Sequence, residues 1–177
     1  LYPSVQFFDE LPYGKPNVID YGEGRTDVDV SDFFGYVVCD ITPPKNLFVP
    51  LLGGKTETGK FCFSLERMPK ATIPTPELHK AIELGYVIER VYKIFDFKKS
   101  RELFKSYIRT FSRAKIESGF SGSDAERDLL IHEYSEKFGI ELRKDMMKPN
   151  AGRKANAKLM LNSLWGKFGQ RQMKTSE

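Results

Sequence analysis

The spacing of apolar residues changes near residue 100 of this 177-residue chain. Before that point, short apolar runs are separated by Pro, Gly and Asn clusters, a pattern typical of strands and turns. After it, apolar residues recur every three or four positions, which is the period of amphipathic helices. The pattern therefore predicts an α+β chain with a β-rich first part and a helical second part.

The first part combines several strand-like runs with one short helix. The runs with strand composition are residues 34–41, 46–52, 60–65 and 86–97. The glycine-rich segment 53–59 predicts a hairpin loop, and it lacks the G-x-x-x-x-G-K-[S/T] pattern of a phosphate loop. Pro and Gly in residues 11–16 predict a turn. Thr75 as the cap, Pro76 in the first turn and Gly85 as the stop predict a helix.

The second part predicts three helices. Residues 103–115 have one apolar face, and we expect Ser100 to cap this helix and Lys115 to end it. Glycines at 119 and 122 then break the pattern. Ser123 and Glu126 have the spacing of a capping box, and Gly139 would end that second helix.

The last helix is predicted to begin after Asn150 as its cap and to end near Gly169. Its two faces differ: Ala157, Leu161, Leu164 and Phe168 form an apolar stripe, and Lys154, Lys158 and Asn162 form a polar one. Residues 146–176 contain seven Lys and Arg and no Asp or Glu. Two cations and an amide on one face can bind a multiply charged anion, although a solvated basic helix has the same pattern.

Charge is divided unevenly along the chain. Residues 1–96 hold 10 Lys and Arg against 14 Asp and Glu, and residues 97–177 hold 18 against 10. Nucleic acid or nucleotide phosphate should therefore meet the second half. No run approaches 18 consecutive apolar residues, so no membrane span is expected. A chain that begins Leu-Tyr-Pro-Ser without Met is interpreted as a piece of a longer protein.

The cysteines and histidines do not predict a metal site. Cys39 and Cys62 lie in strand-like runs, and we expect both to be buried, reduced thiols. With His79 and His132 they make four zinc-ligand types, but their wide spacing contains no C-x₂₋₄-C pair. Asp27 and Asp29 are interpreted as a solvated turn.

The block K-L-M-L-N-S-L-W-G-K-F-G at residues 158–169 resembles motif B of family B DNA polymerases. Leu-Tyr-Pro-Ser at residues 1–4 looks like the end of motif A. Three further features resemble the protein-primed branch of this family: the distance between the two motifs, the segment at 11–16 and the helix ending at Lys115. That branch includes organellar, viral and Maverick/Polinton-type enzymes. The resemblance extends over essentially the whole chain.

This resemblance implies a fragment of a right-hand polymerase. Residues 1–8 would be the edge of the palm, and residues 9–97 a β-rich insert like terminal-protein region 1, which meets the priming protein. Residues 98–169 would be the helical fingers, and residues 170–177 would return toward the palm. The compartment is not known from the sequence; the resemblance implies an intracellular one, in the nucleus, the mitochondrion or a cytoplasmic site of viral or phage replication.

The resemblance also assigns roles to individual residues. Contacts with the incoming deoxynucleoside triphosphate (dNTP) fall to Tyr2, Lys115, Lys154, Lys158 and Asn162. Lys158 would neutralise the triphosphate, and Tyr2 would exclude a 2′-hydroxyl. Arg153 competes with Lys154 for its role.

Further roles concern the DNA and the metal ions. Trp165, which stands where most relatives have Tyr, and Gly166 would lie at the nascent base pair. Lys167 and Arg171 would bind template or primer phosphates. The catalytic Asp residues of motifs A and C, and hence the ligands of two Mg²⁺ ions, lie outside this chain, so the chain alone should be inactive.

Two main functions fit these observations. The first is part of a DNA-directed DNA polymerase, a nucleotidyltransferase, whose partners are primer, template, dNTP and a terminal priming protein. The second is a non-catalytic nucleic-acid-binding or protein-interaction module derived from a polymerase. A decayed mobile-element relic is a third interpretation, against which the intact register of motif B argues.

Tyr2→Val, made in the full-length protein that contains this chain, should admit ribonucleotides because the ring that collides with a 2′-hydroxyl is removed. The measurement is kcat/KM for a ribonucleotide relative to the matching deoxynucleotide. Tyr13→Val is the matched control and should leave this ratio unchanged. An unaltered ratio in Tyr2→Val would remove the sugar-selecting role.

Overall fold

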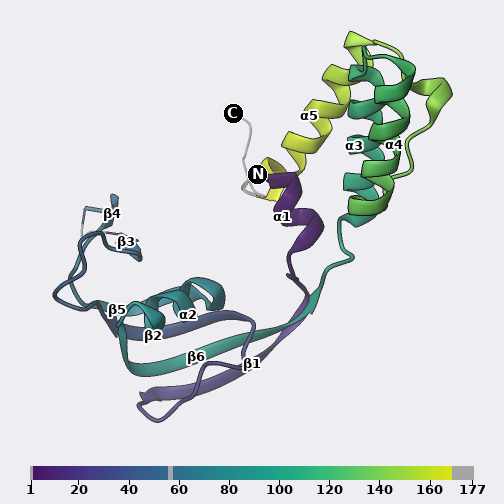
Figure 1. The fold of residues 1–177 in the computed structure, drawn as a ribbon. Helices are drawn as coiled ribbons and strands as arrows, with labels where there is room; N and C mark the ends of the chain where they lie inside the picture. The colour runs from purple at the N-terminus through teal and green to yellow at the C-terminus, as the bar shows by residue number, and fades with distance from the viewer. Residues whose placement is uncertain (1, 56–57, 169–177) are drawn as a thin grey trace, which may run out of the picture. The chain divides into compact units, whose positions relative to one another are not determined.

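The computed structural model describes residues 2–55 and 58–168 (Figure 1). The chain forms two compact units. One comprises Pro12–Ser100, and the other comprises the described residues on either side of that range. Strands dominate the first unit and helices the second, so the predicted α+β class is confirmed. No helix in the described part of the chain is long and apolar enough to cross a membrane.

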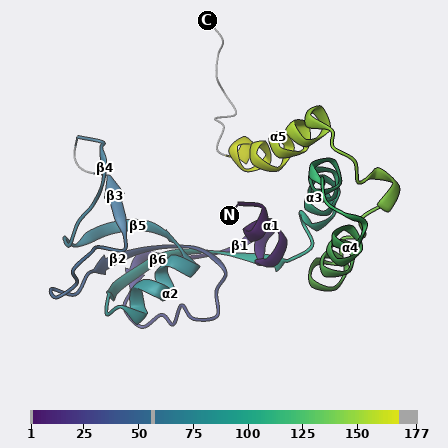
Figure 2. The same cartoon turned by 45° about the horizontal axis from the view of Figure 1, so that its top comes forward.

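The β-rich unit is built on a four-stranded sheet. Its strands, in spatial order, are β1 (Leu11–Arg25), β6 (Val87–Ser100), β2 (Gly35–Thr42) and β5 (Met68–Pro74). The central strand β2 runs antiparallel to both β5 and β6. Helix α2 (Thr75–Glu83) links β5 to β6 and packs against the sheet, as Figure 2 shows. A separate hairpin pairs β3 (Gly53–Lys55) with β4 (Phe61–Phe63).

The core of this unit lies between α2 and the sheet. Leu78 and Ala81 of α2 are fully buried against apolar side chains of β2, β5 and β6, among them Val37, Ile41, Ile73, Val91 and Ile94. The two helix residues are three positions apart, so they share one helix face. The strands predicted at 34–41 and 86–97 are confirmed as β2 and β6. A hairpin is present, and β4 lies in the strand predicted at 60–65, but β3 lies inside the segment 53–59 that was predicted to be the loop.

Four further details of the secondary structure of this unit differ from the sequence prediction. Residues 11–16 begin β1 rather than forming a turn; β1 is an edge strand, where proline is tolerated, and Gly14 takes a φ of +78°. Residues 46–52 form turns and bends, because the backbone N–H of Leu51 donates to the Tyr86 hydroxyl at 3.0 Å instead of to a strand. Thr75 does not cap α2, since its buried hydroxyl accepts the Gly35 N–H at 3.0 Å.

The fourth difference is β5, which the sequence did not predict. Its two prolines, Pro69 and Pro74, disfavour a strand, but its position at the sheet edge accommodates them. Asp27 and Asp29 lie in an exposed bend, as expected. There Asp27 pairs with Arg25 and the Asp29 carboxylate accepts the Ser31 N–H.

The two cysteines lie in different environments. Cys39 is fully buried in β2, and burial, with a smaller effect of the neighbouring Asp40 carboxylate, raises the pKa of its thiol to about 12. Cys62 is exposed in β4, so its predicted burial is wrong. Among the described residues, the hairpin that carries Cys62 forms a separate two-stranded sheet of β3 and β4, and all three residues of β4 are exposed.

The helical unit contains α1 (Tyr2–Phe8), α3 (Lys105–Gly119), α4 (Asp124–Phe138), the 3₁₀ turn η1 (Lys144–Met146) and α5 (Ala151–Phe168). Two apolar clusters hold these elements together. One centres on Phe7, Ile108 and Leu161 and joins α1, α3 and α5. The other centres on Ile140, Leu142 and Met147 and packs against residues of α3 and α4.

The predicted ends of these helices have mixed outcomes. The capping box of Ser123 and Glu126 is confirmed, and Gly139 ends α4 with a φ of +59°. Asn150 caps α5 as predicted, because its Oδ1 accepts the Arg153 N–H at 2.9 Å. Ser100 does not cap α3; it ends β6, and α3 starts at Lys105 without a side-chain cap. Lys115 does not end α3, which continues one further turn to Gly119.

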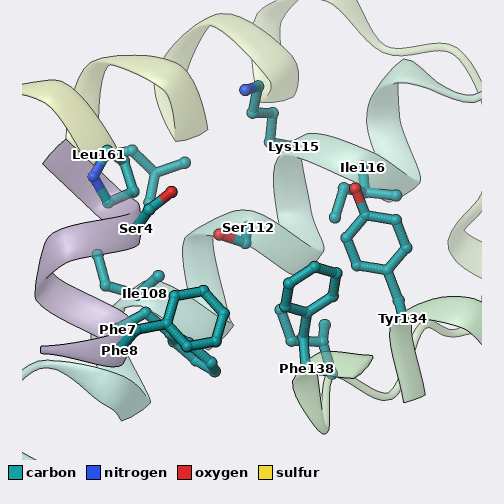
Figure 3. Close-up of a pocket in the computed structure, with 12 residues that line it drawn as sticks. Ser4, Phe7, Phe8, Ile108, Ser112, Lys115, Ile116, Tyr134, Phe138 and Leu161 are labelled. Carbon is teal, nitrogen blue, oxygen red and sulfur yellow. The ribbon is translucent and has the colours of Figure 1, made fainter. Parts of the chain in front are cut away.

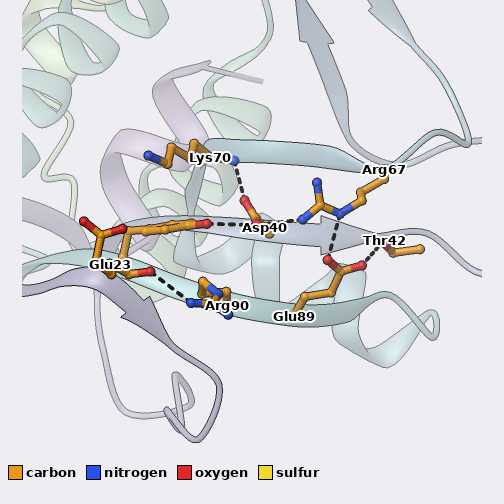
Figure 4. A network of polar contacts seen from close by, with 8 residues as sticks. Glu23, Asp40, Thr42, Arg67, Lys70, Glu89 and Arg90 are labelled. Carbon is orange, nitrogen blue, oxygen red and sulfur yellow. Dashed lines mark hydrogen bonds and ion pairs between the residues drawn. The ribbon is translucent and has the colours of Figure 1, made fainter.

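A polar network crosses the sheet of the β-rich unit (Figure 4). The nearly buried Asp40 carboxylate accepts the Lys70 N–H at 2.7 Å, the Tyr92 hydroxyl at 3.0 Å and Arg67 Nη2 at 2.7 Å. Arg67 also donates to Glu89 at 2.7 Å. Burial by itself raises the pKa of the Asp40 carboxyl, but these donors more than offset it, so the pKa lies below its ordinary value.

Asp40→Asn should destabilise the β-rich unit at neutral pH by about 1–3 kcal/mol, because a charged acceptor with three donors is lost. A carboxyl whose folded pKa is lowered stabilises the fold above its unfolded pKa of roughly 3.9, and this stability is lost as the pH falls through the lower folded value. The free energy of unfolding of the Asp40→Asn variant should therefore change less between neutral and acid pH than that of the protein with Asp40. Hydrogen exchange of β2, β5 and β6 amides, corrected for intrinsic rates, measures this; Asp27→Asn is the exposed control.

Candidate functional site

Helix α5 presents the two stripes that the sequence predicts. Ala157 and Leu161 are buried, at 3% and 4% exposure, and Leu164 is half-buried. The polar stripe of Lys154, Lys158 and Asn162 is exposed. The apolar stripe continues to Phe168, which is 63% exposed but whose ring lies 5.5 Å from that of Phe104. Packing against the other helices therefore fixes which side of α5 remains available to a ligand.

Helices α3 and α5 lie side by side in opposite directions (Figure 1). At one end the Asn150 N–H, just before α5, donates to the Ser118 carbonyl at 2.9 Å. Farther along, the Tyr107 hydroxyl donates to the Met160 carbonyl at 2.9 Å. Lys115 precedes Ser118 by one turn and therefore lies beside the first half of α5, the half that carries Lys154 and Lys158.

Lys115 and Lys158 are exposed cations without an ion pair or side-chain hydrogen bond in residues 2–55 and 58–168. Asn162 likewise has no such bond within that part of the chain. Many other cations of the helical unit are paired, among them Lys137 with Glu133 and Lys144 with Asp128. An exposed lysine that has no acidic neighbour keeps its full charge available for an anion.

Lys154 and its neighbour Arg153 make different contacts. The Lys154 side chain lies across the last residue of α3, so that a Cβ added to Gly119 would be 3.1 Å from Lys154 Nζ. A cation is favourable there because the carboxyl end of a helix carries partial negative charge. Arg153 Nη2 donates to the fully buried Glu117 carboxylate at 2.6 Å. Arg153 is thus neutralised within the protein, whereas Lys154 has no carboxylate partner among the described residues.

A cavity of about 280 Å³ opens between α1, α3 and α4. Figure 3 shows apolar side chains that line it, among them Phe7, Phe138 and Leu161, and the few polar groups of Ser4, Ser112, Lys115 and Tyr134. The Lys115 amino group points away from the rings of Phe7 and Phe138. A mainly apolar cavity of this kind suits a ring or a side chain better than a triphosphate. Lys115 therefore lies where the apolar cavity ends and the charged surface of the helices begins.

The remaining predicted site residues lie toward the end of α5 or outside the described residues. Trp165 is 40% exposed, and Lys167 is exposed. Gly166 is exposed too, and a Cβ added to it would meet nothing within 4 Å of the described residues. The Tyr2 side chain and Arg171 lie outside what the structure describes.

The described residues contain no group of three or more His, Cys, Asp or Glu side chains that could bind a metal ion. The described residues therefore do not form a site for the two Mg²⁺ ions that the resemblance implies. The resemblance assigns the ligands of those ions to residues outside this chain. No step of chemistry is assigned to a metal within these residues.

Sequence reasoning missed Glu117, whose carboxylate is among the most buried polar groups of the chain. Its signal was present: it is the only acidic residue of α3, which otherwise carries Lys105, Arg109, Arg113 and Lys115. A lone carboxylate in a basic helix can indicate a buried ion pair. The pattern alone did not identify Arg153 as its partner, because that contact joins residues 36 positions apart.

Comparison with known proteins gives concordant results. The family described as DNA polymerase type B, organellar and viral, matches residues 1–130. A probable DNA polymerase from Agaricus bitorquis is 28% identical over 149 residues, which are 80% of this chain and 14% of that protein. The block at 158–169 lies beyond the residues that the family matches.

Solved structures of phi29 DNA polymerase share the fold. The orthorhombic crystal form has a TM-score of 0.55 at 21% identity and covers 96% of this chain and 25% of its own. A ternary complex with primer-template DNA and incoming nucleotide substrates has a TM-score of 0.56 at 22% identity, covering 95% and 25%. The predicted polymerase-fragment fold is confirmed, and the chain spans a quarter or less of these relatives.

Gly166→Ala should separate stability from function. Because no described atom lies near the added methyl group, the change should stabilise α5 by up to about 1 kcal/mol. If the glycine leaves room for the nascent base pair, the same change should slow nucleotide incorporation by the full-length protein. Gly152→Ala, in the first turn of α5, is the control that should leave incorporation unchanged. Normal incorporation by Gly166→Ala would assign the glycine no role at the base pair.

Proposed function

Because this chain belongs to the organellar and viral family of type B DNA polymerases, we propose that it is part of an enzyme that adds deoxynucleotides to a primer as directed by a DNA template. Within that enzyme the helical unit binds the dNTP and DNA. The chain does not supply the catalytic carboxylates. Protein priming, with the β-rich unit as the region that meets the priming protein, is part of the same proposal.

One observation carries this proposal: α5 buries Ala157 and Leu161 and leaves Lys158 and Asn162 exposed without intramolecular partners in the described residues. If this polar stripe served packing, other side chains would cover it. If it served only solubility, it would carry both positive and negative side chains. Lys115, on the adjoining α3, adds a cation from a second helix. Two cations from separate elements can bind a triphosphate from different directions, which fixes its orientation as well as its charge.

The chemistry of nucleotide transfer assigns a task to each residue. The triphosphate must be drawn into line with the primer hydroxyl, and negative charge on the departing pyrophosphate must be stabilised. Lys158 serves the second task, Lys115 and Lys154 add to the binding of the triphosphate, and Asn162 donates its amide beside the phosphates and sugar. Tyr2 excludes ribonucleotides from below the sugar.

DNA binding follows from charge. Trp165 stacks at the nascent base pair, Gly166 allows close approach of the backbone, and Lys167 and Arg171 bind phosphates of primer or template. Phosphate contacts of this type are independent of sequence and weaken with salt. The phi29 ternary complex, which contains primer-template DNA and incoming nucleotides, supports this arrangement by the likeness of its fold. Two Mg²⁺ ions, bound by carboxylates outside this chain, would activate the primer hydroxyl and stabilise the leaving group.

Lys158→Ala in the full-length protein should raise the Kd for dNTP by roughly 10- to 100-fold and slow incorporation, since a charge-assisted interaction is worth about 1.5–3 kcal/mol. Affinity for primer-template duplex should change little. Single-turnover incorporation as a function of dNTP concentration separates Kd from rate, and a gel or fluorescence assay gives duplex affinity.

Lys137→Ala is the matched control, because Lys137 is an exposed lysine of α4 that pairs with Glu133 at 2.8 Å. It should leave both quantities unchanged. If Lys158→Ala lost duplex affinity while its Kd for dNTP stayed the same, the helix would be a DNA-binding surface and the proposed nucleotide site would be wrong.

A further inference from the structure

Glu117 is a fully buried carboxylate that joins three segments of the helical unit. It lies in the last turn of α3. Its Oε1 accepts the backbone N–H of Arg143, which precedes η1, at 2.9 Å. Its Oε2 accepts Arg153 Nη2, in the first turn of α5, at 2.6 Å. The Arg143 side chain is a second cation, with Nε 3.6 Å from Oε1.

A carboxylate in this position restricts the geometry around it. Taking a charge out of water is costly unless donors surround it, and losing one partner leaves the other charge unpaired. A shift of α5 along or around α3 would lengthen the contact between Arg153 and Glu117. Well-packed apolar residues can stabilise a core as much as a buried ion pair does, and the ion pair additionally specifies one register.

The register that Glu117 specifies is the one that places the phosphate-binding cations. Lys115 lies two residues before Glu117 on α3, and Lys154 directly follows Arg153 on α5. The adjoining Asn150 N–H bonds to the Ser118 carbonyl at 2.9 Å. Lys158 follows one turn later on the same face as Lys154. The buried ion pair therefore lies at the point where the two lysine-bearing helices are joined.

We propose that Glu117, through Arg153 and the Arg143 N–H, is a positioning residue that sets the register of α5, and with it Lys158, against α3 for the triphosphate of an incoming nucleotide. This inference rests on the proposed nucleotide site. Glu117 itself touches no substrate, because its side chain is fully buried. This positioning role also explains why Arg153 and Lys154 differ. Arg153 holds α5 against Glu117, and Lys154 remains available to the anion.

The test uses the full-length protein with Glu117→Gln, which keeps the shape of the side chain but replaces one of its two acceptor oxygens by an NH₂ group. The side chain can then accept from the Arg143 N–H or from Arg153 Nη2 but not from both, and it no longer balances the Arg153 charge. We expect the Kd for the templated dNTP to rise roughly 5- to 50-fold, because a displaced Lys158 keeps only part of the charge-assisted interaction, which is worth about 1.5–3 kcal/mol. Duplex affinity should be unchanged. Glu133→Gln, which breaks the exposed pair with Lys137, is the control and should leave the Kd unchanged.

A double variant distinguishes positioning from general loss of structure. If Glu117 acts through Lys158, then Glu117→Gln should raise the Kd for dNTP little or not at all when Lys158 is already Ala. Additive effects of the two changes, or an unchanged Kd in folded Glu117→Gln, would overturn the inference. An unchanged Kd in Lys158→Ala alone would instead overturn the proposed nucleotide site.

Arg153→Lys provides a second route in case Glu117→Gln does not fold. It keeps the positive charge beside Glu117 but loses the planar fork that fixes the geometry. The same rise in Kd, again absent when Lys158 is Ala, supports the inference. A folded Arg153→Lys protein with an unchanged Kd overturns it.

Discussion

The packing of α3 against α5 is the constraint on which the candidate site depends. Leu161 is buried with Ile108 and Phe7, and this contact leaves the adjoining polar stripe of α5 outside the apolar packing. Lys158 and Asn162 are exposed as a consequence. Because the two helices run in opposite directions, the end of α3 meets the beginning of α5, and cations from both helices lie along the same pair. A site that uses charges from two helices needs their register to be fixed.

Polar contacts supply that fixed register, and apolar contacts supply the bulk of the packing. Apolar side chains such as Leu161 can slide or exchange partners at moderate cost, since their attraction has no direction. The Glu117 carboxylate, with donors from α5 and from the segment before η1, tolerates much less displacement. The β-rich unit has a similar arrangement, in which Asp40 binds donors from β5 and β6 beside an apolar core. In both units a buried carboxylate joins strands or helices that are distant in sequence.

Local chemistry explains which parts of the fold the sequence could predict. The capping box at Ser123, the cap at Asn150 and the left-handed Gly139 depend on a few neighbouring residues, and all three are confirmed. The predictions at Ser100 and Thr75 are wrong because those residues were assigned to local caps while tertiary structure used them otherwise. The Thr75 hydroxyl accepts the backbone N–H of Gly35, 40 residues away, and Ser100 ends a strand whose length is set by pairing.

The sequence by itself determined the α+β class and the two faces of α5, because both follow from the spacing of apolar residues. It also determined the family to which the chain belongs, because that depends on the order of residues along the chain and not on their contacts. Tertiary structure alone decided that prolines could enter β1 and β5, since only the sheet order reveals which strands are edges. It also decided that Arg153 is committed to Glu117 and that Lys154 lies across Gly119. Those choices depend on distances between residues far apart in the chain, which no local pattern records.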